Sequence, residues 1–199
     1  MWTLIPLGNP GPDYERTRHN LGRLLLLRWL EHGGIRPKPL KQFQTGTLYR
    51  LTDPLQALVP ATYMNLSGQV LAEALAAGLD PARMIVLVDD KDLPLGCGRF
   101  RLAGSDGGHN GLRSLLEALG SDRLARLRLG IGPFTRPLHE FVLGEWSEAE
   151  WTSLHRLDRP FDQFLATLVP GEQLEHLPGK VNGDAFWGGE DPLDPGTEA

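Results

Sequence analysis

The stretch MIVLVDD, residues 84–90, is a continuous apolar run that ends in two aspartates. A short apolar run of this kind, bounded by polar residues, is typical of a strand buried on both faces of a sheet. Helical patterns lie on either side of it in the chain, at residues 66–77 and 111–119. The stretch therefore predicts a central strand with helices packed over it.

The rest of the chain alternates between strand and helix patterns. The order of these patterns predicts one α/β domain over residues 1–180, a three-layer sandwich in which helices cover both faces of a twisted mixed β-sheet. We expect further strands at residues 2–7, 45–51, 55–59, 98–102 and 127–131, and further helices at residues 21–32 and, in two pieces broken at Pro160, at residues 146–167.

The composition is that of an ordinary globular protein, with 41% hydrophobic residues in a chain of 199. The one cysteine, Cys97, permits no internal disulfide, which fits a reducing cytoplasm. No apolar stretch is long enough to cross a bilayer, and the N-terminus lacks the pattern of a signal peptide. We therefore expect a cytoplasmic protein that makes no membrane contact, with Cys97 a bystander rather than a nucleophile.

Charge is spread unevenly along the chain. The net charge is −5, but residues 181–199 hold five of the 25 acidic groups and no basic one, so residues 1–180 are neutral. Because glycine, proline and acidic residues dominate residues 181–199, we expect a disordered acidic tail there. Residues 99–136 instead carry seven arginines against three acids. Such a run is either a solvated face or a site for a polyanion, since arginine pairs with phosphate.

Polar residues follow several of the expected strands. Asn9 follows the first strand, Asn65 follows the strand at residues 55–59, and Asp89 ends the central apolar run. His109 and Asn110 follow the strand at residues 98–102. In open α/β sheets, ligands bind beyond the carboxyl ends of the strands. We therefore expect these side chains to meet at one edge of the sheet.

Four motifs resemble those of the bacterial peptidyl-tRNA hydrolase family, in that family's order: GNPGPDYERTRHNLG (8–22), PATYMNLSG (60–68), VDDKDLPLGCGRFRLAGSDGGHNGL (88–112) and RLRLGIG (126–132). The resemblance covers roughly residues 2–146. It implies an α/β monomer that cleaves the ester joining a peptide to the 3′ ribose of tRNA, and so recycles tRNA from prematurely released chains. It also implies that no metal or other cofactor is used, and that peptidyl-tRNA is held by its acceptor end and its phosphate backbone.

The resemblance also assigns roles to individual residues. It implies that His19 is the catalytic histidine and that Asp89 is the carboxylate that orients it. The substrate-binding positions that it implies are Asn9, Tyr14, Tyr63, Asn65 and Asn110, with the asparagines holding the peptidyl end and the attacking water. Arg101 and Arg128 match basic positions that the family uses against tRNA phosphate. Pro6 and Val88 depart from the family pattern at positions without a role, and we expect only local repacking there.

The same chemistry can be argued from the residue types. Ester hydrolysis needs a water, a base that takes its proton, and donors to the oxyanion that forms. A neutral histidine is available as the base near pH 7, a carboxylate on its other ring nitrogen fixes its tautomer, and asparagine amides can donate to the oxyanion. The positive end of the expected helix after His19 disfavours protonation of the ring, whereas Asp89 favours it. The sequence does not rank these two effects.

From the sequence alone, purely structural interpretations of the same residues stay open. His19 is a capping or half-buried residue if its companions lie elsewhere, and His109 is structural rather than catalytic. Asn9 and Asn65 are alternatively turn formers, and Asn110 is alternatively a helix N-cap.

Other chemistries find less support. A zinc site from His19, Asp89 and His109 is conceivable, but the sequence has no HExxH and no paired cysteines. Neither Ser67 nor Ser105 lies in a GxSxG motif, and GSDGGHNG lacks the spacing of a phosphate loop. The rival from another class is a non-catalytic RNA-binding relative. The intact histidine, aspartate and three asparagines favour the enzyme over that rival.

Overall fold

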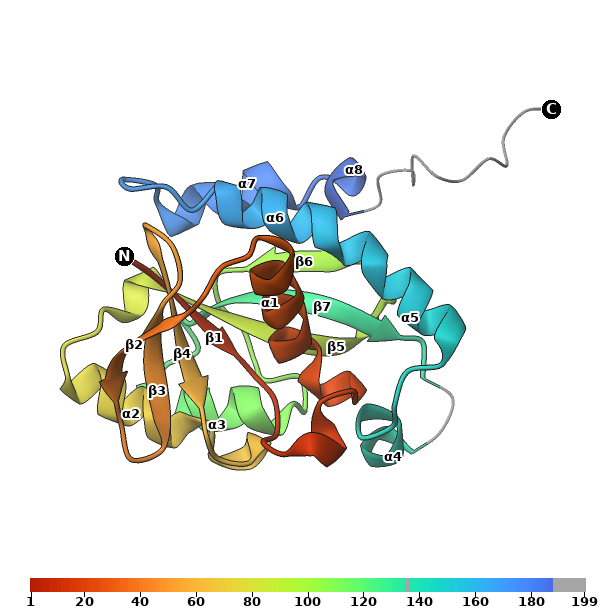
Figure 1. Ribbon diagram of the computed structural model, residues 1–199, viewed down its shortest axis with the longest axis horizontal. Helices are drawn as coiled ribbons and strands as arrows, with labels where there is room; N and C mark the ends of the chain where they lie inside the picture. Colours follow the sequence, from red (N-terminus) through yellow and green to blue (C-terminus); the bar gives the residue numbers. More distant parts are fainter. Residues whose placement is uncertain (135–136, 188–199) are drawn as a thin grey trace.

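A seven-stranded mixed sheet forms the centre of the computed structural model, which describes residues 1–134 and 137–187 (Figure 1). In sheet order the strands are β2 (Lys38–Gln42), β3 (Gly46–Arg50), β4 (Leu55–Pro60), β1 (Trp2–Pro6), β5 (Met84–Pro94), β7 (Ala125–Gly132) and β6 (Gly98–Arg101). The four central strands β4, β1, β5 and β7 are parallel, whereas β2, β3 and β6 add antiparallel pairs at the two edges.

Helices pack on both faces of this sheet, which confirms the expected three-layer α/β sandwich (Figure 1). One face carries α1 (Leu21–His32), α5 (Glu148–Leu154), α6 (Asp158–Ala166), α7 (Leu177–Val181) and α8 (Asp184–Trp187). The other face carries α2 (Gly68–Ala76) and α3 (Asn110–Leu119). A short helix, α4 (Leu138–Val142), lies beside the turn that precedes α1. No helix in the described ranges is both long and apolar enough to cross a bilayer.

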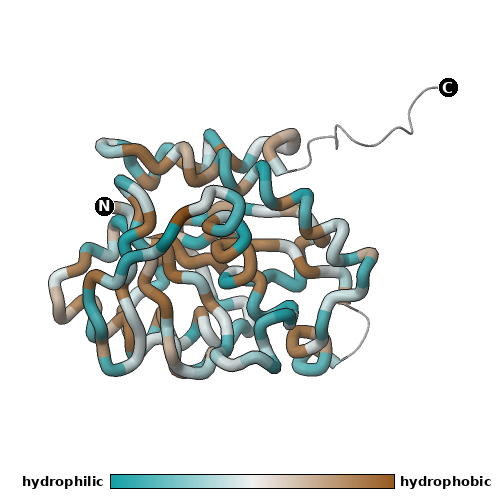
Figure 2. Tube along the Cα trace, in the orientation of Figure 1, coloured by the Kyte–Doolittle hydropathy of each residue, from teal (hydrophilic) through white to brown (hydrophobic). Residues whose placement is uncertain are grey.

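The central strand β5 has the character that its sequence predicts. Residues Met84–Val88 are all buried, and their side chains alternate between the two cores: Ile85 and Leu87 pack under α1, whereas Met84, Val86 and Val88 pack under α2 and α3. The apolar residues accordingly gather along the middle of the trace in Figure 2. The strand continues past the apolar run to Pro94, because β7 pairs with Asp89 and Asp90 as well. This extension carries two carboxylates out of the core at the end of the sheet.

Four of the strands and α-helices, β2, α4, α7 and α8, have no counterpart in the expected set. The edge strand β2 is exposed along its whole length, so its sequence KPLKQ has no alternation of apolar and polar residues to reveal it. Its backbone pairs with β3 across an irregular register between Pro39 and Lys41. The short helix α4 buries one residue, Phe141, and is too short to show a helical period.

The break expected at Pro160 is misplaced. Residues 146–167 do form two helices, but the interruption is a 3-10 turn at His155–Leu157, and Pro160 is the third residue of α6. A proline in the first helical turn is tolerated, because the N–H that it lacks has no intrahelical acceptor there.

The expectation of a disordered tail is wrong for residues 181–187. Val181 is buried at the end of α7, and the Asn182 side chain pairs with both the backbone N–H and the backbone C=O of Phe100 in the edge strand β6. Trp187, in α8, is 6% exposed and lies against Gly98, where a Cβ would come within 2.5 Å of the indole ring. One aromatic side chain with a matching glycine thus orders a segment whose average composition is polar. Residues 188–199 of the expected tail lie outside the described ranges.

Candidate active site

A cavity of about 750 Å³ opens at the carboxyl ends of the parallel strands. Its walls come from the loop after β1 with the 3-10 turn η2 (Arg18–Asn20), from η3 (Met64–Leu66) after β4, from β5, and from the loop that leads into α3. The cavity lining includes seven of the nine expected site residues: Asn9, His19, Asn65, Asp89, Arg101, Asn110 and Arg128. The arrangement follows from topology, because parallel strands end at the same edge of a sheet.

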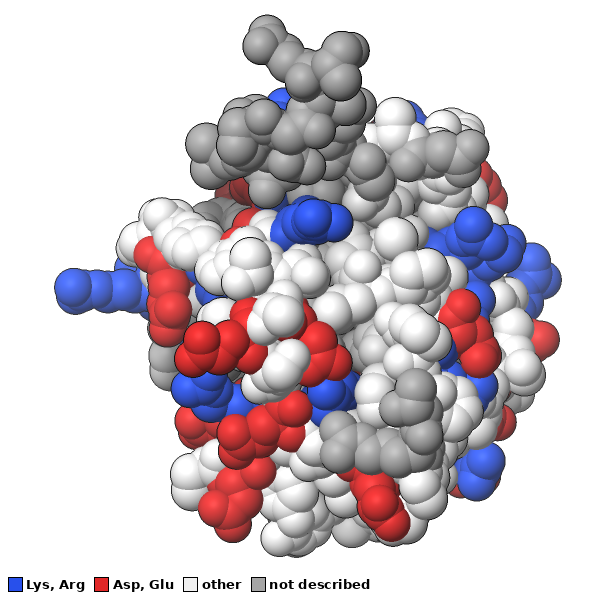
Figure 3. Space-filling view, turned by 90° about the vertical axis from the view of Figure 1, so that its right-hand side faces the viewer, with Lys and Arg blue, Asp and Glu red and all other residues white. Residues whose placement is uncertain are grey.

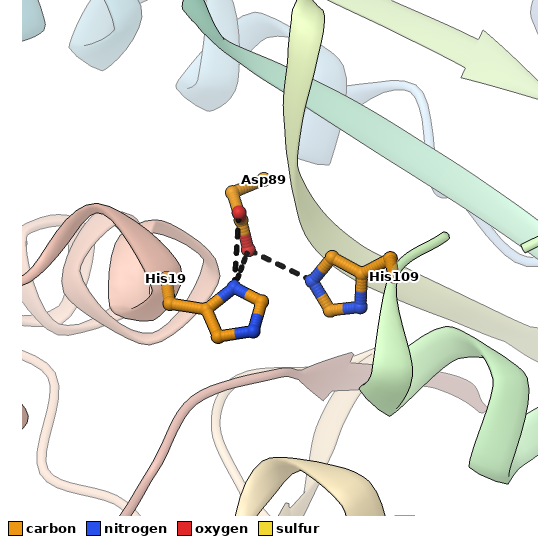
Figure 4. A group of neighbouring side chains, drawn as sticks. All are labelled: His19, Asp89 and His109. Atoms are coloured by element: carbon orange, nitrogen blue, oxygen red, sulfur yellow. Dashed lines mark hydrogen bonds and ion pairs between the residues drawn. The ribbon is translucent and has the colours of Figure 1, made fainter. Parts of the chain in front are cut away.

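The catalytic pair expected from the sequence is in contact. His19 Nδ1 lies 3.1 Å from each of the two Asp89 carboxylate oxygens, although seventy residues separate them in the chain (Figure 4). His19 is 9% exposed and Asp89 is 6% exposed, so the pair is shielded but the imidazole reaches the cavity. With Nδ1–H donating to Asp89, the other ring nitrogen, Nε2, is left as the basic atom. Figure 4 shows that nitrogen pointing away from the carboxylate.

Burial and charge act in opposite directions on this pair. Burial disfavours the protonated form of His19, but the negative charge of Asp89 and its hydrogen bond outweigh it and raise the pKa of His19 above its ordinary value. Burial likewise disfavours the ionised form of Asp89, but the two neighbouring histidines outweigh it and lower the pKa of this carboxyl well below its usual range. At His19 the carboxylate therefore prevails over burial.

His109 lies in the site at the expected edge of the sheet, but its contact with Asp89 goes beyond the structural role that the sequence favours. Its Nε2 lies 2.9 Å from Asp89 Oδ1, and its Nδ1 accepts a hydrogen bond of 3.1 Å from the backbone N–H of Leu112. Because Nδ1 must be unprotonated to accept that bond, Nε2 carries the proton of the neutral ring and donates to Asp89. His109 is also the N-cap of α3, so the expected structural role is present, but the residue holds the Asp89 carboxylate as well. The cap alternative for Asn110 is wrong by one position, since Asn110 is the first residue of α3.

The orientation of the Asn9 side chain is fixed by its neighbours. Its Oδ1 accepts a hydrogen bond of 2.8 Å from the backbone N–H of Met64. Asn20 holds the Asn9 backbone from the other side, because its Oδ1 accepts from the N–H and its Nδ2 donates to the C=O, at 2.8 and 2.9 Å. With Oδ1 occupied, the amide group that Asn9 offers to the cavity is its NH₂ donor. No residue-type pattern in the sequence pointed to this role of Asn20.

The remaining polar positions divide into those inside and those outside the cavity. Asn65 and Asn110 are exposed and line it, and within the described ranges neither side-chain amide has a protein partner. Tyr14 and Tyr63 lie edge to face, with ring centroids 6.1 Å apart, but neither belongs to the described residues that line the cavity. Tyr63 is 56% exposed, so this aromatic pair faces solvent beside η3.

The arginine-rich run divides into groups with different surroundings. Arg101 is exposed at the cavity, whereas Arg128 pairs with Asp90 in the same wall. Arg126 is buried, and its guanidinium donates to the backbone carbonyls of Leu124, Gly104, Ser105 and Asp122, so it holds the loop that leads to His109. Basic and acidic side chains alternate on the face drawn in Figure 3. The run is thus neither wholly a solvated face nor wholly free for an anion.

The cluster of His19, Asp89 and His109 has donor atoms close enough together to be considered as a metal site. Metal-bound histidines usually donate their second ring N–H to an acceptor. In His109 the second nitrogen instead accepts the N–H of Leu112, so a metal at Nε2 would require this helix cap to be broken. The hydrogen bonds around the cluster therefore suit a proton-transfer site better than a metal centre.

Comparison with known proteins gives consistent matches along the chain. The family model described as peptidyl-tRNA hydrolase matches residues 3–185, which extends past the 2–146 expected from the motifs. Peptidyl-tRNA hydrolases from Synechococcus sp. (strain JA-3-3Ab) and Thermotoga sp. (strain RQ2) are 43% and 42% identical to this chain. These matches cover 78% and 83% of this chain and 72% and 89% of those proteins, respectively. A crystal structure of peptidyl-tRNA hydrolase from Acinetobacter baumannii matches with a TM-score of 0.72 and 29% identity, over 92% of this chain and 91% of that one. A structure of peptidyl-tRNA hydrolase in complex with N-propanol matches with a TM-score of 0.76 and 30% identity, over 92% and 95%.

Proposed function

Because the chain belongs to the peptidyl-tRNA hydrolase family, and is therefore an enzyme that hydrolyses the ester between a peptide and tRNA, we propose that His19 is its general base and that Asp89 orients it. The observation that carries this assignment is the buried contact of His19 Nδ1 with the Asp89 carboxylate, 3.1 Å long, at the wall of the cavity. A carboxylate at Nδ1 selects the tautomer whose Nε2 can accept a proton.

The reaction then proceeds by attack of water on the ester carbonyl. His19 Nε2 takes the proton of the water as its oxygen bonds to the carbonyl carbon, and the ring becomes an imidazolium that the Asp89 charge stabilises. The tetrahedral intermediate collapses by breaking its bond to the 3′ oxygen of the ribose. The proton on Nε2 passes to this leaving oxygen, which gives a tRNA with an intact 3′ hydroxyl and a free peptide carboxylic acid, which loses its proton to solvent.

Asparagine amides supply the donors that this intermediate needs. The NH₂ of Asn9 faces the cavity because its oxygen is held by Met64, and Asn65 and Asn110 add two further amides to the same walls. A donor aimed at a developing oxyanion is worth roughly 2.7–4 kcal/mol in other hydrolases. We propose that these three residues bind the peptidyl end and the oxyanion, and that Tyr14 and Tyr63 contact the acceptor end outside the cavity.

The body of the tRNA is bound by charge. We propose that Arg101, exposed at the cavity, and Arg128 contact tRNA phosphates, with Arg128 exchanging its Asp90 partner for a phosphate. We further propose that the enzyme acts as a monomer in the cytoplasm, where translation makes its substrate. Size-exclusion chromatography with light scattering tests the monomer.

Hydrolysis of N-acetyl-aminoacyl-tRNA by the purified protein tests the reaction. The expected products are the N-acetyl amino acid and a tRNA that can be charged again. The Cys97→Ser variant serves as the control and should react at the wild-type rate, since Cys97 is not among the described residues that line the cavity. A protein that binds this tRNA without releasing the amino acid would be a non-catalytic RNA-binding relative, and the assignment of His19 would be wrong.

A further inference from the structure

Arg18, the residue before the catalytic histidine, is a buried charge that the mechanism does not use. It opens the 3-10 turn η2, and only 4% of its side chain is exposed. A buried guanidinium is tolerated where acceptors and an opposite charge surround it. Its contacts therefore show which part of the molecule it holds.

Outside its own turn, the polar contacts that Arg18 makes within the described ranges go to a single segment, residues 141–150. Its Nη1 donates to the backbone carbonyls of Glu145 and Phe141, at 3.0 and 3.4 Å. Its Nη2 lies 2.7 and 2.8 Å from the two carboxylate oxygens of Glu150, at the start of α5. The backbone N–H of Arg18 also donates to Gly144, at 3.1 Å.

This segment contains α4, which is also held by the packing of Phe141 and Val142 against the core, by the ring contact of Phe141 with Phe134 and by the bridge between Thr17 and Glu145. The helix has five residues, too few to be stable without packing, and Phe141 is its buried residue. The Arg18 guanidinium lies 4.6 Å from the centre of the Phe141 ring and 5.1 Å from that of Trp146, both within the range of cation–π contacts. Arg18 therefore holds α4 through its backbone and through its one core side chain.

α4 and its C-cap form part of the cavity wall. Leu138, His139, Val142 and Leu143 line the same cavity as His19 and Asp89. Figure 1 shows α4 beside the turn that carries residues 18–20. Arg18 thus joins the turn that carries His19 to α4, a second wall of the same cavity.

We propose that Arg18 is a positioning residue that fixes α4 at the cavity and thereby sets the affinity for substrate, while Asp89 separately sets the reactivity of His19. The inference rests on the proposed function, since it takes the cavity to be the substrate site. A wall that contacts substrate equally before and during the reaction changes KM and leaves kcat unaltered. Displacing α4 should therefore weaken binding without slowing the bound substrate.

The test compares Arg18→Lys with Arg28→Lys. Lysine keeps the charge but lacks the planar guanidinium group, so it cannot donate to Glu150 and to the carbonyls of Glu145 and Phe141 at the same time. Arg28 is a matched control: it is 8% exposed and pairs with Asp158 between α1 and α6, and it is not among the described residues that line the cavity. We expect KM for N-acetyl-aminoacyl-tRNA to rise by about an order of magnitude in Arg18→Lys, with kcat within about twofold of wild type. Arg28→Lys should keep both constants.

Amide hydrogen exchange supplies a readout that needs no activity. The N–H groups of Phe141, Leu143 and Gly144 bond within the α4 turn, so their exchange should accelerate in Arg18→Lys and not in Arg28→Lys. If Arg18→Lys folds poorly, Glu150→Gln replaces it, since glutamine keeps the capping box with Ser147 but removes the charge opposite Arg18. The expected effects then have the same direction and are smaller.

Three results would overturn the inference. Faster exchange at α4 with an unaltered KM would show that α4 position does not govern affinity. Equal KM increases in the Arg18 and Arg28 variants would reduce Arg18 to a general stabiliser. A fall in kcat with a displaced pH profile would mean that Arg18 acts on His19 itself. Failure of the proposed function would appear differently, as a wild-type protein without hydrolysis whose exchange pattern still depends on Arg18.

Discussion

Replacing Asp89 by asparagine keeps the size of the side chain and removes its charge. In the native site Asp89 Oδ1 accepts from His109 Nε2 at 2.9 Å, and His19 Nδ1 lies 3.1 Å from Oδ1 and from Oδ2. The amide of asparagine has one oxygen for these two histidines. Which of them obtains the oxygen decides how much activity is lost.

The geometry indicates that His109 obtains it. The His109 Nδ1 accepts from Leu112, so its Nε2 is a donor and requires an acceptor. The asparagine oxygen is then held at the Oδ1 position, and the NH₂ group turns toward His19 Nδ1. An NH₂ donor there favours the tautomer with the proton on Nε2, which cannot act as a base. Because Nδ1 also lies 3.1 Å from the Oδ1 position, some molecules keep the working tautomer, and we expect kcat to fall by about 10²- to 10⁴-fold.

The pH profile gives an independent reading of the same contact. A base must be neutral, so activity rises with pH as His19 loses its proton. Asp89 raises the pKa of His19, and removing that charge should move this acidic limb to lower pH. Residual activity in Asp89→Asn should therefore persist at pH values where the wild type has already lost most of its own.

The assay is the initial rate of N-acetyl-aminoacyl-tRNA hydrolysis between pH 5 and 9, with Asp158→Asn as the control. Asp158 pairs with Arg28 and lies 3.4 Å from a histidine, His155, but is not among the described residues that line the cavity. Its variant should retain the wild-type rate and profile. A normal rate and an unmoved acidic limb in Asp89→Asn would refute the orienting role of Asp89.

Three further predictions concern the arginines, the metal and the C-terminal helix. Arg101→Ala should weaken tRNA binding and reduce the slope of log affinity against log salt by about 0.7–0.9. Arg128→Ala should reduce this slope by less, because Arg128 already pairs with Asp90. An unchanged slope for Arg101→Ala would assign that arginine to a solvated face. EDTA should leave the rate unaltered, and activity lost with EDTA and restored by zinc would revive the metal site. Trp187→Ala should lower the free energy of unfolding by about 3 kcal/mol, and Tm by roughly 6–12 °C in a thermal melt, because the indole is 6% exposed; a Tm within 1–2 °C of wild type, as for a surface substitution, would show that α8 does not pack.

The elements that the sequence predicted well are those whose signal is local. The helix at residues 21–32 is found with the same bounds, since a leucine-rich stripe fills it and Gly33-Gly34 ends it. The edge strand β2 is exposed throughout and exists through its pairing with β3, a partner that no local pattern names. The packing of Trp187 runs against the expectation of a disordered tail, which rests on average composition. Averaging over an acidic, glycine-rich segment hid one side chain that fits over Gly98.

The candidate site likewise contains contacts that the sequence predicts and contacts that it does not. Asn9, His19, Asp89 and Asn110 could be placed together from the motifs and from the rule that strand ends share one edge. The second hydrogen bond of Asp89, to His109, could not, because it depends on the path of the loop between β6 and α3. That loop is held by Arg126, whose buried guanidinium binds carbonyls rather than phosphate. Residue type alone does not separate an arginine that orders a loop from one that meets a ligand.

The central claim is that His19 is the base, and His19→Ala tests it most directly. The single-turnover rate with saturating N-acetyl-aminoacyl-tRNA should fall by at least about 10²-fold, the lower end of what a general base contributes. Affinity for the tRNA should stay close to wild type, because His19 contacts Asp89 rather than the arginines proposed to bind phosphate. A His19→Ala enzyme that folds, binds tRNA and still hydrolyses it at nearly the wild-type rate would contradict the account.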